Sequence, residues 1–192
     1  MAGSLTVFTG GMFAEKSTAL IREGKRHIIA GRKVVFLKPE IDNRYSDDSV
    51  VTHDGTEHKA ITIGVNTKMN REEYLQIRDS DVICIDECQF FTSKLFDMID
   101  ALIYEGKQIY VAGLDLDRFG KPFGIVPELM AKAEQVKKFH AVCGFCGKDA
   151  WVTLGTENLT NNKQVNVSND YIPACRTCAE KEGGIKWTFY KN

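Results

Sequence analysis

Residues 10–17 of the chain, GGMFAEKS, place a lysine and a serine at the spacing of a phosphate-binding loop. In the usual pattern, G-x-x-x-x-G-K-[ST], backbone N–H groups cradle an anion, the lysine reaches the β- and γ-phosphates and the hydroxyl holds Mg²⁺. Glu15 replaces the second glycine of that pattern. This segment alone therefore fits two interpretations equally well, a phosphate loop or a strand–helix turn with solvent-facing Lys16 and Ser17.

Two adjacent carboxylates, Asp86 and Glu87, follow the apolar run Val82–Ile85. Ligands of open parallel sheets bind at the carboxyl ends of the strands. There the first carboxylate can serve Mg²⁺ and the second can accept a proton from a nucleophile. An Asp-Glu pair after a strand is also a common N-terminal charge of the next helix. Because both signals occur in this order, the sequence favours a nucleotide site.

Four of the six cysteines form two C-x2-C pairs, Cys143 with Cys146 and Cys175 with Cys178. Each pair can present two thiolates to one tetrahedral ion, and four thiolates close the shell. A closed shell has no place for activated water, so we predict a structural Zn²⁺. Two incidental pairs of buried thiols are the alternative. Cys84 and Cys88, beside the two carboxylates, are predicted to be packing residues.

The apolar pattern predicts the elements that position these groups. Strands are expected at residues 5–9, 34–37, 82–85 and 109–112, helices at 16–31 and 94–105, and a long polar loop at 39–58. Alternating strands and helices imply a parallel sheet. The predicted fold is therefore α/β, a P-loop parallel sheet flanked by helices, with a small C-terminal zinc-binding domain. Composition shifts near Phe139, so we place the domains at 1–138 and 139–192.

Composition and charge narrow the function classes. Hydrophobic residues make up 43% and charged residues 27%, and 25 Lys+Arg against 26 Asp+Glu give a net charge of −1. A dedicated nucleic-acid binder usually has a basic excess, and the apolar runs are far shorter than a membrane span. A strand-like segment begins at Leu5, so we expect no signal peptide. We therefore expect a cytoplasmic protein with no nucleic-acid or membrane partner.

Taken together, four motifs resemble type II thymidine kinase, the zinc-containing class found in bacteria, animals and large DNA viruses. They are the loop at 10–17, I-D-E-x-Q-F-F at 85–91, L-D-x-D followed by G-K-P-F-G at 114–124, and the cysteine pairs within 143–178. The resemblance spans nearly the whole chain and keeps the order and rough spacing of the motifs.

The resemblance implies ATP-dependent phosphorylation of thymidine at its 5′-hydroxyl to give dTMP, a salvage step for DNA synthesis, with deoxyuridine as a second substrate. It also implies Mg²⁺ with ATP, a structural Zn²⁺, feedback inhibition by dTTP, and a homotetramer.

Individual roles follow from the same resemblance. Lys16 and Arg44 would offset phosphate charge, and Glu87 would be the base for the 5′-hydroxyl. Contacts to ATP and Mg²⁺ are expected from Gly10, Gly11, Met12, Phe13, Ala14, Glu15, Lys16, Ser17, Thr18, Asp42 and Asp86. The thymidine pocket is expected from Met12, Phe90, Leu114, Phe119, Phe123, Val167 and Tyr171, with Val165–Asp170 as a lasso over the base. A surface salt bridge is the alternative interpretation of Asp42 and Arg44 if the resemblance is set aside. Simple core packing is the alternative interpretation of the apolar residues.

The chain departs from the family pattern at three places. A carboxylate at Glu15, about 5 Å from a phosphate charge, costs roughly 3 kcal/mol at an effective dielectric near 20. Its placement at a helix N-terminus returns only about 0.3–1 kcal/mol. Bacterial members usually read Asp-Phe-Arg-Gly where this chain has Asp-Arg118-Phe119-Gly, and Ser168-Asn169 replace the usual lasso glycine. A catalytically weak nucleotide-binding relative and a zinc-ribbon, nucleic-acid-dependent ATPase are the competing hypotheses.

Overall fold

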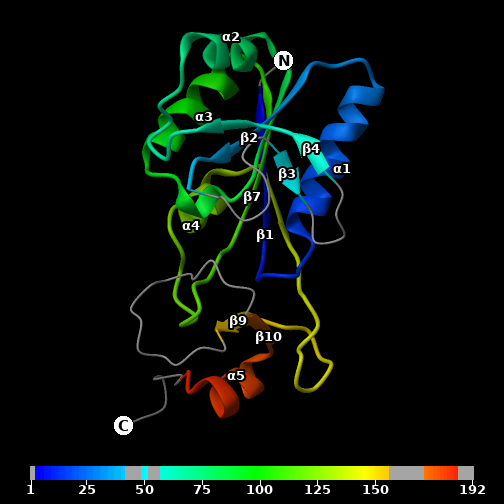
Figure 1. Ribbon diagram of the computed structural model, residues 1–192, viewed down its shortest axis with the longest axis vertical. Helices are drawn as coiled ribbons and strands as arrows, with labels where there is room; N and C mark the ends of the chain where they lie inside the picture. Colours follow the sequence, from blue (N-terminus) through cyan, green and yellow to red (C-terminus); the bar gives the residue numbers. More distant parts are fainter. Residues whose placement is uncertain (1–2, 42–48, 52–56, 156–170, 186–192) are drawn as a thin grey trace.

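A six-stranded sheet forms the larger part of the molecule, and each neighbouring pair of its strands is parallel (Figure 1). The computed structural model describes residues 3–41, 49–51, 57–155 and 171–185. In spatial order the strands are β5 (Ile61–Ile63), β2 (Val34–Pro39), β6 (Val82–Ile85), β7 (Gln108–Gly113), β1 (Ser4–Thr9) and β8 (Gln135–Lys138). The predicted parallel α/β fold is confirmed.

Helices cover both faces of this sheet, which explains why its central strands are apolar on both sides. Successive residues of β2 show the alternation, because Val35 and Leu37 pack in one core cluster and Phe36 in the other. The cluster around Phe36 contains the apolar face of α1 (Lys16–Ile29). The opposite cluster contains side chains from α2 (Arg71–Asp79), α3 (Lys94–Tyr104) and α4 (Val126–Lys132).

Several elements lie where the sequence predicted only a loop or nothing. The polar segment 39–58 was wrongly predicted to be loop throughout, because β3 (Ser49–Val51) and β4 (Glu57–Lys59) form an antiparallel pair within it. Helix α2 was missed because it is short and mostly polar. Its N-terminal signal was nevertheless present, since Asn70 and Glu73 form a reciprocal capping box. Strand β8, with the sequence QVKK, is exposed along its length and has no apolar periodicity.

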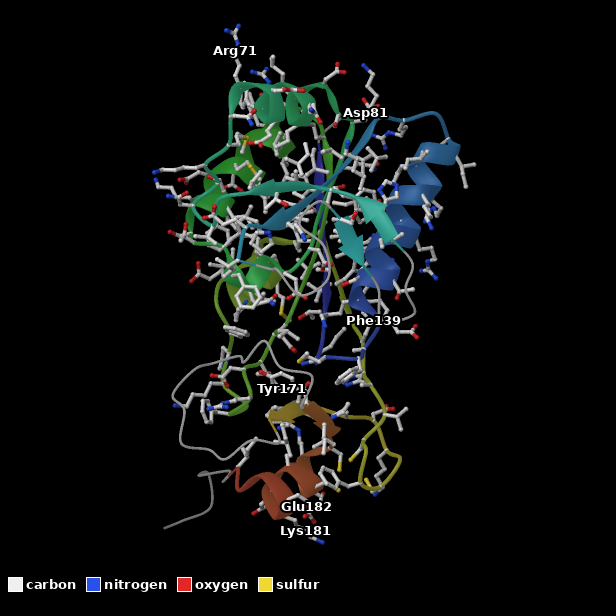
Figure 2. All side chains as sticks on the ribbon, in the orientation of Figure 1. Arg71, Asp81, Phe139, Tyr171, Lys181 and Glu182 are labelled. Carbon is white, nitrogen blue, oxygen red and sulfur yellow. The ribbon has the colours of Figure 1, made fainter. Side chains whose placement is uncertain are left out.

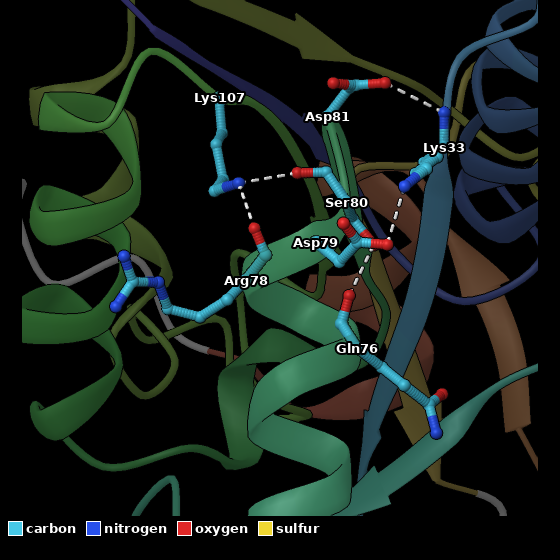
Figure 3. Close-up of polar contacts among 7 residues, drawn as sticks. All are labelled: Lys33, Gln76, Arg78, Asp79, Ser80, Asp81 and Lys107. Carbon is cyan, nitrogen blue, oxygen red and sulfur yellow. Dashed lines mark hydrogen bonds and ion pairs between the residues drawn. The ribbon is translucent and has the colours of Figure 1, made fainter.

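The sheet end opposite the carboxyl ends of the strands is held by a polar network (Figure 3). Lys107 Nζ donates to the backbone oxygens of Arg78 at 2.6 Å and Ser80 at 2.7 Å, at the C-terminus of α2. Lys33 Nζ pairs with Asp79 at 2.7 Å. A cation near the last carbonyl groups of a helix is favourable. These contacts fix α2 against the starts of β2, β6 and β7.

A smaller C-terminal module follows β8. It contains the antiparallel pair β9 (Val152–Gly155) and β10 (Tyr171–Ala174), followed by α5 (Arg176–Gly183). Its own small core is formed by Val152, Leu154, Ala174 and Ala179. Figure 2 shows Phe139 and Tyr171 at the junction with the sheet, whereas Lys181 and Glu182 lie at the far end of the module. None of the helices described here is long and apolar enough to cross a membrane.

Candidate active site and metal centre

The loop between β1 and α1 has the tight, partly left-handed backbone of a phosphate-binding turn. Gly10 has a φ of 138°, and a Cβ placed on it would lie 2.2 Å from the Phe139 carbonyl oxygen, so this position requires glycine. Phe13 and Glu15 have φ values of 64° and 57° without being glycine. Such conformations cost free energy in L-residues and are found preferentially at functional sites. The left-handed conformation at Glu15 explains why a glycine suits this position.

The phosphate loop and the acidic pair meet at the carboxyl edge of the sheet, although β7 separates β1 from β6. The Ser17 hydroxyl and the Lys16 ammonium both lie close enough to the Asp86 carboxylate to favour its ionised form. Lys16 Nζ also donates to the Gly11 carbonyl oxygen at 2.7 Å, so the ammonium group lies along the loop. A hydroxyl and a carboxylate side by side are suitable oxygen ligands for Mg²⁺.

Asp86 is buried, and its pKa is raised to about 7. Burial is the main cause, and the neighbouring charge of Glu87 adds to it. The nearby Ser17 hydroxyl and a hydrogen bond from the Glu87 backbone N–H at 2.9 Å act in the opposite direction. A cation bound beside this carboxyl group would favour its ionised form. A carboxyl group with so strongly raised a pKa is typical of a functional site.

Glu87 sits at the start of the 3-10 helix η1 (Cys88–Phe90) with a left-handed backbone, φ 50° and ψ 41°. Its carboxylate accepts a hydrogen bond from the side-chain amide of Gln89. The side chain of Glu87 is half-buried, unlike that of its neighbour Asp86. The two adjacent carboxylates therefore have different surroundings, one buried and one partly exposed beside Gln89.

Three apolar residues predicted to surround the thymine lie together beyond Glu87. The rings of Phe90 and Phe123 meet edge to face with their centroids 6.0 Å apart. Leu114, at the end of β7, donates its backbone N–H to Gln89 Oε1 at 3.0 Å. Phe123 and Leu114 are buried, and Phe90 is half-buried. Figure 1 shows the loop after β7, which carries Leu114, descending toward β9 and β10.

Arg118, rather than Phe119, occupies the inner position of that loop. Arg118 is 7% exposed, whereas Phe119 is half-exposed and lies with its ring centroid 4.8 Å from the Arg118 guanidinium carbon. A Cβ placed on Gly155 would be 3.7 Å from Arg118 and 3.8 Å from the Tyr171 ring. Arg118 and the buried Tyr171 therefore flank the same stretch of β9, and Phe119 lies outside this pair.

A cleft of about 330 Å³ lies between the phosphate loop and the link to the C-terminal module. Phe13, Glu15 and Thr18 line it from the loop and from α1, and Phe139 and His140 line it from the link to the C-terminal module. Glu15 is exposed there. The sequence assigned Phe13, Glu15 and Thr18 to nucleotide contact, and the structure places all three around one cleft.

The four cysteines of the two C-x2-C pairs form one cluster. The sulfur atoms of Cys143, Cys146, Cys175 and Cys178 all lie within 4.8 Å of one another, and those of Cys146 and Cys175 are 3.6 Å apart. Tetrahedral Zn²⁺ with Zn–S bonds of about 2.3 Å requires sulfur atoms roughly 3.8 Å apart, so the cluster fits this ion.

The electrostatics of the cluster also suit a metal. Burial opposes ionisation of Cys143, but backbone N–H groups of Cys175, Phe145 and Cys146 directed at its sulfur outweigh burial and lower its pKa to about 6. Burial and the neighbouring thiols raise the pKa of Cys178 to about 12. The backbone hydrogen bonds to Cys143 are of the kind that orient a metal ligand and favour its thiolate form. By contrast, burial raises the pKa of Cys84 and Cys88, which lie apart in the core as predicted.

Thr153 was missed by sequence reasoning, although it joins the C-terminal module to the phosphate loop. Its hydroxyl oxygen accepts a hydrogen bond from the Met12 backbone N–H at 2.9 Å. Ala14 packs with Ala141, Ala150 and Phe139 in a small cluster shared by the loop and the module. A lone threonine on a short strand carries no sequence signal for this contact.

Three residues assigned to the site, Asp42, Arg44 and Val167, lie outside the described residues. The lasso at Val165–Asp170 lies outside them as well. Their assigned roles therefore stay predictions from the sequence.

Comparison of the sequence with models of known protein families shows the family to which the chain belongs. A family model described as thymidine kinase matches residues 3–179. The chain belongs to the thymidine kinase family. The matched range includes the phosphate loop, the acidic pair, the loop after β7 and all four cysteines of the cluster, so no part of the candidate site depends on residues outside it.

Among solved structures, AMPPCP-bound DnaA from Aquifex aeolicus aligns with this chain at 12% identity and a TM-score of 0.45. The alignment covers 72% of this chain and 40% of DnaA, so the chain spans less than half the length of that protein. A likeness this slight has no bearing on the function.

Proposed function

We propose that the protein transfers the γ-phosphoryl group of ATP to the 5′-hydroxyl of thymidine, giving dTMP and ADP. The observation that carries the proposal is that Ser17 and Lys16 of the phosphate loop both lie near enough to Asp86 to lower its pKa, which supports one centre built by the loop and the acidic pair. Membership of the thymidine kinase family supports the nucleoside as acceptor.

Each group has a part in this scheme. Backbone N–H groups of residues 10–17 and the ammonium of Lys16 hold the triphosphate. Ser17 and Asp86 would hold Mg²⁺, which would offset the charge of the phosphates. Glu87 accepts the proton of the 5′-hydroxyl as its oxygen bonds to the γ-phosphorus and the bond to the β,γ-bridging oxygen breaks. Arg44, from its position in the sequence, is proposed to offset charge on the transferring group.

Thymidine is proposed to lie between Glu87 and the junction with the C-terminal module. Phe90, Leu114 and Phe123 would form the apolar wall beside the base, and Tyr171 would contact the deoxyribose. Deoxyuridine is proposed as a second substrate on the resemblance to type II thymidine kinase. Cytoplasmic location, feedback inhibition by dTTP, a homotetramer and the domain boundary at 138/139 remain part of the proposal.

Replacing Glu87 with Gln tests the base role directly. We expect kcat to fall by about 10²–10⁴-fold, the usual contribution of a positioned proton acceptor. Thymidine affinity, measured by calorimetry, should change little because the glutamine side chain has nearly the same volume as the glutamate it replaces. Full turnover by Glu87→Gln would remove it from this role. Adding DNA to the same assay separates the competing hypothesis, because a nucleic-acid-dependent ATPase would hydrolyse ATP faster without phosphorylating thymidine.

A further inference from the structure

Gln89 is a buried amide with both ends of its side chain engaged. It is 3% exposed and lies on η1, two residues after Glu87. Its Nε2 donates to the Glu87 carboxylate, and its Oε1 accepts the Leu114 backbone N–H at 3.0 Å. One side chain therefore links the candidate base to the strand end that carries part of the candidate thymidine pocket.

The surrounding backbone leaves this amide little freedom. A Cβ placed on Gly113 would lie 2.9 Å from Gln89 Oε1, and one placed on Gly124 would lie 2.3 Å from the Gln89 backbone oxygen. The chain therefore passes Gln89 at two close approaches, before and after the loop 114–123, that only glycine permits. Because the amide is buried and confined, its direction is set by the fold rather than by the substrate.

A carboxylate at the start of a short 3-10 helix needs such support. Glu87 has several rotatable bonds and is half-buried, so a fixed hydrogen-bond partner narrows the positions open to its carboxylate. A general base is effective only when it is held within hydrogen-bond reach of the proton it accepts. The Gln89 amide supplies a fixed donor to one oxygen of the Glu87 carboxylate.

We propose that Gln89 is a positioning residue for phosphoryl transfer, which orients the Glu87 carboxylate and fixes it relative to the Leu114 wall of the nucleoside pocket. This inference rests on the proposed function. It predicts that substitutions of Gln89 slow the chemical step rather than weaken nucleoside binding. It also predicts that these substitutions act through Glu87.

Two variants separate the two arms of the amide. Gln89→Glu is nearly isosteric and keeps an acceptor for Leu114 N–H, but it loses the donor to Glu87. Gln89→Met removes both arms at similar volume. We expect each variant to lower kcat by roughly 10–100-fold, with KM for thymidine within about threefold of the unmodified protein. Gln76→Leu, at an exposed position on α2, is the matched control and should leave both constants unchanged.

A double-mutant cycle shows whether the effect passes through Glu87. In the Glu87→Gln background, Gln89→Met should change kcat by less than about threefold, because residues that act as one unit are not additive. An equal loss in both backgrounds would overturn the proposal, as would full kcat in Gln89→Glu.

An NMR measurement decides the same point without turnover. The side-chain amide resonance of Gln89, assigned by its loss in Gln89→Glu, should shift in Glu87→Ala but not in Gln76→Leu. A resonance insensitive to Glu87 would contradict the proposal. If the unmodified protein does not phosphorylate thymidine, the proposed function fails, whereas this resonance still reports whether Gln89 holds Glu87.

Discussion

At the scale of single residues, the candidate site contains three residues in energetically unfavourable states, Glu15, Asp86 and Glu87. Glu15 and Glu87 both hold left-handed backbone conformations, and Asp86 is a buried carboxylate. Each of these features costs folding free energy on its own. All three occur within the segments proposed to bind the phosphates and the acceptor, which is where such costs are expected to be retained for function.

Glu15 combines two separable costs, its charge and its backbone conformation. We expect Glu15→Gln to tighten ATP binding by relieving repulsion between the carboxylate and the phosphates. Glu15→Gly should tighten ATP binding as well, and it should also stabilise the fold by up to about 1 kcal/mol, because glycine adopts a φ of 57° without strain. Calorimetric ATP titration and chemical denaturation measure the two effects. Unchanged ATP affinity in both variants would show that the carboxylate points away from the nucleotide.

The raised pKa of Asp86 predicts how stability depends on pH. Because its folded pKa is about 7 and its ordinary value is 3.8, the folded state binds the extra proton between these values. Stability contributed by this group is therefore lost as pH rises from about 4 to 7. We therefore compare the free energies of unfolding of Asp86→Asn and of the unmodified protein in buffer without Mg²⁺. The difference between them should shift in favour of the variant by about 2 kcal/mol from pH 5 to pH 8. Denaturation curves at the two pH values check this, and a difference that does not vary with pH would contradict it.

At the scale of elements, the C-terminal module contacts the phosphate loop directly at the candidate site. Strand β9 reaches the loop through Thr153, and Phe139 stands between β8 and the module (Figure 2). The cysteine cluster holds the chain that precedes β9 to the chain that follows β10, so it fixes the base of the segment that presents Tyr171. A structural metal in this cluster would therefore help to shape the nucleotide site without contacting it.

Thr153→Val removes the acceptor for the Met12 N–H while keeping the side-chain volume. We expect nucleotide affinity to fall several-fold and stability to fall by about 1 kcal/mol, because a half-buried loop N–H loses its partner. Thr153→Ser keeps the hydroxyl and should behave much more like the unmodified protein. Fluorescent-nucleotide titration of both variants measures the effect. Equal affinity in Thr153→Val and Thr153→Ser would mean that this contact does not order the loop.

At the scale of the whole molecule, much of the architecture could be predicted from the sequence. Central strands such as β6 are continuous apolar runs covered on both faces, so their pattern survives in the sequence. The exposed edge strand β8 has no such pattern, because it pairs on one side only among the described strands. The hairpin of β3 and β4 is likewise too short and polar to be recognised.

The candidate site was predictable where its residues are adjacent in sequence and not where they meet only in space. Loop 10–17, the acidic pair and the cysteine pairs are local motifs. The contact of Thr153 with Met12 spans 141 positions, and that of Gln89 with Leu114 spans 25. Neither leaves a local pattern, because each is created by the packing of separate elements. The order Arg118-Phe119 could be resolved only by seeing which side chain is buried.

The central claim is that one centre, built by the phosphate loop and the acidic pair, phosphorylates thymidine at the 5′ position. The direct measurement is transfer of label from γ-³²P-ATP with Mg²⁺ to thymidine, with 5′-deoxythymidine and 3′-deoxythymidine as matched acceptors. We predict labelled 5′-monophosphate from thymidine and from 3′-deoxythymidine, and no labelled nucleotide from 5′-deoxythymidine. Absence of transfer to thymidine, or labelling of 5′-deoxythymidine, would contradict the account.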